Sequence, residues 1–94
     1  MRVISRKATR EFGKLHPDSV ASLSNWLTMA RKAKWLNFTA LRADFGTADQ
    51  VGRRTVFNIG GNKYLLIARV NYRTQRVFIL WIMKHTEYAK GEWK

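Results

Sequence analysis

The hydrophobic pattern of this 94-residue chain changes its period near the middle, and that change limits the folds it can adopt. In the first half, apolar residues recur every three or four positions, as they do on one face of an α-helix. From Thr55 onward, runs rich in β-branched and aromatic residues alternate with a period of two, which is typical of strands. Helices followed by strands predict one α+β domain, residues 1–94, whose helices cover one face of an antiparallel sheet.

Two amphipathic helices are expected before the strands. Arg2–Ile4 indicates a short strand, and Ser5 can then cap a first helix. The apolar face of that helix would hold Ala8, Phe12 and Leu15. Pro17 would end it, and Asp18 would cap a second helix over residues 19–34. The inward stripe of the second helix would be Val20, Leu23, Leu27 and Ala30.

A short third helix and three strands would complete the domain. The helix would begin at Asn37 or Thr39, direct Leu41 inward and stop at Gly46. The strands would cover Thr55–Ile59, Lys63–Tyr72 and Arg76–Met83. The turn GGN (60–62) supplies the positive φ angles that tight hairpins need, so consecutive strands would be antiparallel neighbours in a meander.

Alternation within the last two strands separates a core face from a ligand-facing one. The wholly apolar set is the better core face: Leu66, Ala68, Val70, Val77, Ile79 and Trp81. The opposite set carries four basic residues: Lys63, Arg69, Arg76 and Lys84. This ligand-facing set would also contain Leu65, Leu80 and Ile82. Trp35 and Trp93 are the tryptophans expected at the surface.

Positive charge points to a polyanionic partner. Eighteen Lys and Arg residues against six Asp and Glu give a net charge of +12. Self-repulsion of that size destabilises a compact chain, so nucleic acid is the expected partner, with a merely solvated basic surface as the alternative. The chain has no cysteine, and no apolar run is long enough to span a bilayer. We therefore expect a cytoplasmic protein without a membrane partner.

The residue types present suit RNA cleavage without a metal ion or cofactor. The acidic residues are scattered, and neither a metal-ligand spacing nor a nucleotide-binding glycine motif occurs. RNA carries its own nucleophile, the 2′-hydroxyl, so a ribonuclease needs a proton donor, a proton acceptor and cations around the phosphate. Histidine has an ordinary pKa of about 6.5 and can fill either role. His85 and Tyr88 are the candidates; the simpler interpretation makes them a strand end and a packing residue.

Several stretches resemble the HigB family of bacterial toxins. They are WLNFTALRADF (35–45), ADQV (48–51), VFNIGGNKYLLIARVNY (56–72), VFI (77–79) and HTEY (85–88). The resemblance implies a RelE/ParE-like fold, with two or three helices packed on an antiparallel meander. It also implies the toxin half of a type II toxin–antitoxin module, an mRNA endoribonuclease that usually acts on the ribosome. A helix-turn-helix antitoxin of the HigA type would inhibit it and would be its only link to operator DNA.

The resemblance and the basic surface together imply roles for particular residues. His85, Tyr88 and Lys63 would be catalytic. The RNA-binding residues would be Arg53, Arg54, Arg69, Arg73, Arg76 and Lys84. Leu65 and Leu80 stand where the family commonly has arginine, so we expect weaker phosphate binding and reduced activity. Two alternatives stay open: a non-catalytic RNA- or ribosome-binding protein of the same fold, and a ParE-like gyrase inhibitor.

Overall fold

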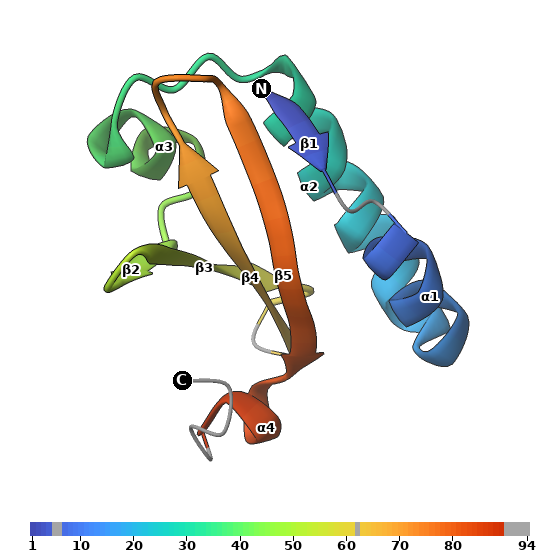
Figure 1. Cartoon of the computed structure of the whole chain (residues 1–94). Helices are drawn as coiled ribbons and strands as arrows, with labels where there is room; N and C mark the ends of the chain where they lie inside the picture. The colour runs from blue at the N-terminus through green and yellow to red at the C-terminus, as the bar shows by residue number, and fades with distance from the viewer. Residues whose placement is uncertain (5–6, 62, 90–94) are drawn as a thin grey trace.

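The helices and the strands form separate layers, as the change of period predicts (Figure 1). The computed structural model describes residues 1–4, 7–61 and 63–89. The N-terminal elements are β1 (Arg2–Ile4), α1 (Lys7–Leu15), a 3₁₀ turn η1 (Pro17–Ser19), α2 (Val20–Lys32) and α3 (Phe38–Asp44). They are followed by β2 (Asp49–Val51), β3 (Arg54–Ile59), β4 (Tyr64–Asn71), β5 (Arg76–Lys84) and α4 (His85–Ala89). None of the helices in these ranges is long and apolar enough to cross a membrane.

The sheet has five strands in the order β1-β5-β4-β3-β2. Strands β3 to β5 form the expected antiparallel meander, with Gly60 and Gly61 at positive φ in the turn between β3 and β4. β1 lies parallel to β5, so the sheet is mixed, which the meander pattern does not predict. β2 is also absent from the sequence prediction because three residues are too few to show alternation; it pairs with β3 across a turn at Gly52.

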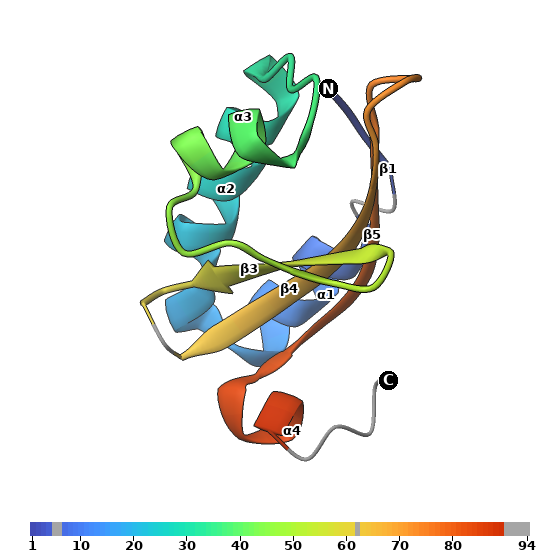
Figure 2. The same cartoon turned by 90° about the vertical axis from the view of Figure 1, so that its left-hand side faces the viewer.

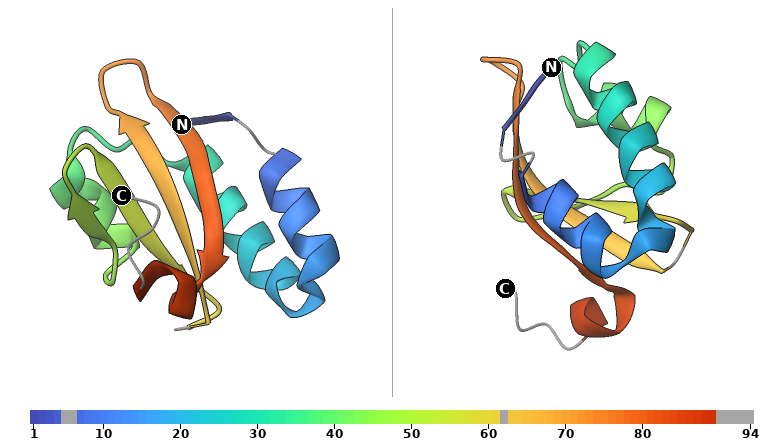
Figure 3. Two further views of the ribbon diagram at one scale, coloured as in Figure 1. Left: turned by 60° about the horizontal axis from the view of Figure 1, so that its bottom comes forward. Right: turned by 90° about the vertical axis from the view of Figure 1, so that its right-hand side faces the viewer.

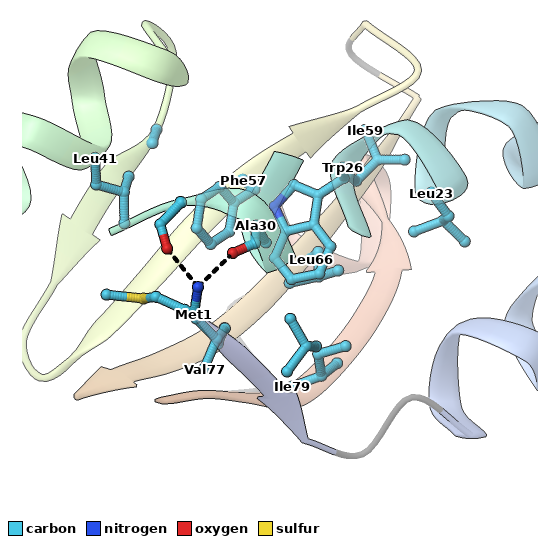
Figure 4. Close-up of a cluster of buried hydrophobic side chains, with 14 of the residues drawn as sticks. Met1, Leu23, Trp26, Ala30, Leu41, Phe57, Ile59, Leu66, Val77 and Ile79 are labelled. Carbon is cyan, nitrogen blue, oxygen red and sulfur yellow. Dashed lines mark hydrogen bonds between the residues drawn. The ribbon is translucent and has the colours of Figure 1, made fainter. Parts of the chain in front are cut away.

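The main core lies between the sheet and the layer formed by α1, α2 and α3 (Figures 2 and 3). Its most deeply buried residues include Leu23, Trp26, Leu41, Phe57, Ile59, Leu66 and Val77 (Figure 4). The amino group of Met1 donates to the carbonyl oxygens of Ala30 and Ala33 at the C-terminal end of α2 (Figure 4). This contact ties β1, at the edge of the sheet, to the helix layer.

The ends of α1 and α2 that meet at η1 differ from the expected pattern. Leu15 is 79 % exposed and Val20 is 51 % exposed, although the helical stripes predict both to face inward. They are the last residue of α1 and the first of α2, and the turn between the helices holds them at the surface. Asp18 does not cap α2, because its carboxylate accepts a hydrogen bond from the hydroxyl of Tyr64 instead. The predicted cap at Ser5 lies outside the described residues.

The third helix forms where expected, but the prediction for a tryptophan in the loop before it is wrong. Asn37 caps α3 by accepting a hydrogen bond from the backbone N–H of Ala40 at 2.8 Å. Trp35, expected at the surface, is only 2 % exposed. Its indole N–H donates to the carboxylate of Asp44 at 2.8 Å, so this loop folds back on α3. Trp93 lies outside the described residues.

A β-bulge in β5 changes the face of the sheet on which the later side chains of this strand lie. Two adjacent residues of β4 pair with Trp81 and Ile79, so Leu80 is an extra residue in β5. Because of this insertion, the alternation after the bulge is shifted by one position. Trp81, predicted for the core, is 40 % exposed on the opposite face. Ile82 and Lys84, predicted for the ligand-facing side, lie on the face turned toward the helices.

We call the sheet face turned away from α1, α2 and α3 the open face. Its central residues are Arg54, Val56, Leu65, Ile67, Arg69, Phe78, Trp81 and Met83. A second, smaller apolar cluster lies on it: Val56, Leu65, Ile67 and Met83, covered by Val51 and Tyr88. Leu65 is therefore on the expected face but only 3 % exposed, because neighbours on three strands and α4 pack around it.

Candidate functional site

His85 and Tyr88 lie at the end of the sheet, where β5 passes directly into α4. The strand ends at Lys84 and the helix begins at His85, so the strand end leads into a helical turn. The backbone N–H of His85 donates to the carbonyl oxygen of Lys63 at 3.1 Å, which holds the start of α4 against the start of β4. The side chain of His85 is exposed, and its ring centroid lies 6.4 Å from that of Tyr88.

Tyr88 is positioned by the apolar cluster of the open face. Its ring is half-buried and packs against the cluster that contains Leu65 and Met83. This packing determines where α4 lies on the sheet, and so it also places His85, one helical turn earlier. The interpretation of Tyr88 as a packing residue and its proposed role in catalysis are therefore compatible.

Lys63 lies beside His85, but its side chain contacts the helix side of the sheet. Its ammonium group is 3.6 Å from the carboxylate of Asp18, and the hydroxyl of Tyr64 donates to the same carboxylate at 2.8 Å. The bond from Tyr64, followed by the charge of Lys63, holds the pKa of Asp18 below its usual value, and the same bond raises the pKa of Tyr64. Exposed ion pairs are weak, so a phosphate can compete with Asp18 for Lys63.

A second histidine and tyrosine lie on the other side of Lys63. The ring of His16 is half-buried, and its centroid lies 4.4 Å from Phe12 and 5.3 Å from Tyr64. The carbonyl oxygen of His16 accepts a hydrogen bond from the hydroxyl of Ser19 at 2.7 Å. This group joins the helical turn to the start of β4. No local sequence pattern signals the contact between His16 and Tyr64, because the two residues lie far apart in the chain.

Half of the basic residues expected to bind RNA lie far from His85. Arg69 is on β4, Arg76 begins β5, and Arg73 is in the turn between those strands. A strand rises about 3.3 Å per residue, so Arg69 is roughly 20 Å from Lys63. The structure therefore separates these three arginines from the His85 end of the open face.

The remaining basic residues lie closer to α4 or to the middle of the open face. Arg53 is exposed in the turn between β2 and β3. The guanidinium of Arg54 lies over the indole ring of Trp81, 4.9 Å from its centroid. Lys84 is exposed and precedes His85 directly. Sequence reasoning missed Trp81 because nothing in the strand pattern signals a bulge at Leu80.

This arrangement supplies groups that transfer protons and groups that bind an anion. The imidazole of His85 and the phenol of Tyr88 are groups of the first kind, and the ammonium groups of Lys63 and Lys84 are groups of the second kind; these are the residues expected from the sequence to form the site. Leu65, at one expected arginine position, is buried; Leu80, at the other, is 38 % exposed. Within residues 1–4, 7–61 and 63–89, no three His, Cys, Asp or Glu side chains cluster as a metal site requires.

Comparison with known proteins relates the whole chain to one group of toxins. A family model described as HigB_toxin, RelE-like toxic component of a toxin-antitoxin system, matches residues 19–91. The mRNA interferase toxin HigB of Escherichia coli (strain K12) is 28 % identical over 91 residues, which cover 94 % of this chain and 88 % of the relative. The mRNA interferase HigB of Shigella flexneri matches with the same identity and coverage. That of Escherichia coli O6:H1 is 26 % identical over 93 residues, which cover 96 % of this chain and 90 % of the relative.

Proposed function

This chain belongs to the HigB family of RelE-like toxins, and we propose that it is an mRNA endoribonuclease that works without a metal ion. The observation that carries the proposal is the position of His85, which is exposed, close to Tyr88 and bonded through its backbone to Lys63. The relatives named mRNA interferase HigB span nearly the whole chain and support the same activity. As a toxin acting on mRNA, the protein would work in the cytoplasm.

The proposed reaction uses the 2′-hydroxyl of the RNA as the nucleophile. His85 accepts the proton of that hydroxyl while its oxygen attacks the adjacent phosphorus. The bond between phosphorus and the 5′ oxygen breaks, and the hydroxyl of Tyr88 gives its proton to that leaving oxygen. Lys63 and Lys84 stabilise the additional negative charge on the phosphate oxygens. The products are a 2′,3′-cyclic phosphate and a free 5′-hydroxyl.

Cleavage of a defined mRNA in EDTA tests this proposal directly. The purified chain is incubated with the mRNA in the presence and in the absence of ribosomes, and primer extension maps the cut sites. We expect cleavage of the free mRNA in EDTA with cyclic phosphate ends, and stronger cleavage with ribosomes, which are tested in a separate buffer containing the Mg²⁺ that ribosomes need. Cleavage of the free mRNA that requires added Mg²⁺, or an undiminished rate in His85→Ala, would contradict the proposal.

The leucines at positions 65 and 80 support reduced activity and a second candidate function. Neither supplies a charge, and Leu65 is enclosed by apolar neighbours next to Tyr88. Each missing charged contact is worth about 1–3 kcal/mol. If the two losses together abolish cleavage, the chain is a non-catalytic RNA- or ribosome-binding protein. Salt-dependent RNA binding without any cut site would identify this second function.

We also propose that the partner of this toxin is a helix-turn-helix antitoxin of the HigA type, which alone contacts operator DNA. A groove of about 400 Å³ between α1 and α2 is a suitable docking surface. Among the residues that the structure describes, its lining includes the apolar residues Val20, Leu23 and Leu27 and the basic residues Arg10 and Lys14, and no acidic residue. An amphipathic antitoxin helix with an apolar stripe and acidic flanks would complement both features.

Copurification of the chain with its co-expressed antitoxin tests this docking surface. Val20→Lys places a charge in the groove at an already exposed position and should abolish copurification. Leu36→Lys is the matched control, because Leu36 is 79 % exposed and does not line the groove. Equal recovery of the antitoxin with both variants would place the docking site elsewhere.

A further inference from the structure

Trp81 is a large aromatic side chain that the fold turns toward solvent in the middle of a well-packed strand. It is 40 % exposed, whereas Ile79 and Met83, two positions away on either side, are 4 % and 9 % exposed. The bulge at Leu80 causes this difference, since without it Trp81 would continue the buried face of Val77 and Ile79. An indole at this position is therefore available to a ligand on the open face.

One cationic side chain contacts this indole, and a second lies on the same face of the sheet. The guanidinium of Arg54 lies over its ring, 4.9 Å from the centroid, which is within the range of a cation–π contact. Arg69 lies on the same face, opposite Phe78 on the neighbouring strand. Ile67, the residue paired with Trp81, is fully buried and forms the apolar base of the site. Flat π-surfaces next to guanidinium groups are what an unpaired nucleobase and its phosphate require.

We propose that Trp81, together with Arg54, binds an unpaired nucleobase of single-stranded RNA by stacking. The proposal rests on the proposed function only because it takes RNA as the ligand. It adds a position that binds a base, which the cleavage reaction at His85 does not itself require. Trp81 lies four positions before His85, which at about 3.3 Å per residue is roughly 13 Å. The stacked base would therefore belong to a nucleotide beside the cleaved bond, and this position would influence which sites are cut.

Binding of an uncleavable RNA tests the inference separately from catalysis. The probe is a short single-stranded RNA with 2′-O-methyl groups, which has no 2′-hydroxyl nucleophile, and its binding is followed by fluorescence anisotropy. Trp81→Ala should weaken binding by about tenfold, because loss of a stacking side chain commonly has that effect. Trp81→Phe should retain most of the affinity, since a π-surface remains. Leu36→Ala, at an exposed apolar position remote from the open face, is the control and should bind as the wild type does.

A duplex of the same sequence distinguishes stacking from attraction to phosphate. Its bases are already paired and stacked, so its affinity should be the same for the wild type and for Trp81→Ala. Equal binding of the single strand by these two proteins, or an equal loss for strand and duplex, would overturn the inference. A wild type that binds the single strand through Trp81 but cleaves no mRNA would refute the endoribonuclease and leave this inference standing. Failure of the wild type to bind the single strand would overturn both.

Discussion

One histidine–tyrosine pair lies on each side of Lys63, and the two pairs differ in what surrounds them. His16 and Tyr64 lie between the helical turn and the sheet; Tyr64 is 7 % exposed and its hydroxyl is bonded to Asp18. His85 and Tyr88 begin α4, where the imidazole is exposed and only the tyrosine ring is packed. The ring centroids are 5.3 Å apart in the first pair and 6.4 Å apart in the second.

The comparison shows that residue type alone does not identify a reactive site. Both pairs offer an imidazole and a phenol near the same lysine. In the pair of His16 and Tyr64 these groups hold the helical hairpin to β4, so their contribution is to stability. In the pair of His85 and Tyr88 the packing of one ring leaves the other ring accessible to RNA. Substitutions in the two pairs and in the residues near them test this division of roles.

The largest expected effect is that of His85→Ala on cleavage. Loss of a general acid or base should lower the single-turnover rate by about 10²–10⁴-fold, while the free energy of unfolding changes by less than about 0.5 kcal/mol, because the side chain is exposed. His16→Ala should do the opposite: it should reduce stability by about 1 kcal/mol through lost ring contacts and leave cleavage intact. Urea unfolding and quenched-flow cleavage measure both. Equal losses of rate in the two variants would contradict the comparison.

Removing the tyrosine hydroxyls further distinguishes the roles of the two pairs. Tyr88→Phe keeps the packing on the open-face cluster and loses the proposed proton donor, so the cleavage rate should fall roughly tenfold or more. Tyr64→Phe loses the bond to Asp18, so stability should decrease slightly while cleavage remains. The same two assays apply. A normal rate in Tyr88→Phe would leave Tyr88 with a packing role only.

Leu80→Arg tests whether the site lacks positive charge. Leu80 is 38 % exposed at the bulge, so a guanidinium fits there without being buried, and RNA cleavage should increase by about tenfold. Leu65→Arg is a poorer test, because it would place a charge among apolar neighbours and destabilise the fold. Growth arrest on induction and cleavage in vitro are the measurements. Unchanged toxicity after Leu80→Arg would show that the missing arginine at this position does not limit activity.

The smallest effect concerns Asp18 and acid stability. Its pKa is lowered in the folded chain, so its stabilising contribution is complete above the ordinary carboxyl value and is lost as the pH falls through the folded value. Asp18→Asn should therefore reduce the unfolding midpoint at neutral pH slightly and make it less sensitive to pH below about 4. The variant should also bind RNA slightly better, since Lys63 loses its partner. Urea titrations at several pH values measure the effect. A pH dependence of stability that is the same in the wild type and in Asp18→Asn would contradict this assignment.

Much of the fold could be predicted because its signals are local. The helical stripes, the cap at Asn37 and the turn at Gly60 and Gly61 depend on residues within a few positions of one another. The family motif HTEY then indicated which end of the sheet carries the proposed chemistry.

The faces of β5 beyond Leu80 could not be predicted, because one extra residue reverses the alternation. Trp81 therefore lies on the open face and not in the expected core, and Lys84 lies on the face turned toward the helices and not on the expected ligand-facing side. The contacts of Lys63, Asp18 and Tyr64 were equally hidden, since they join segments far apart in the chain. By itself, the sequence determined most of the elements, their order and the candidate residues of the site. The tertiary structure alone decided which of them are accessible together, because burial and pairing depend on neighbours that no local pattern specifies.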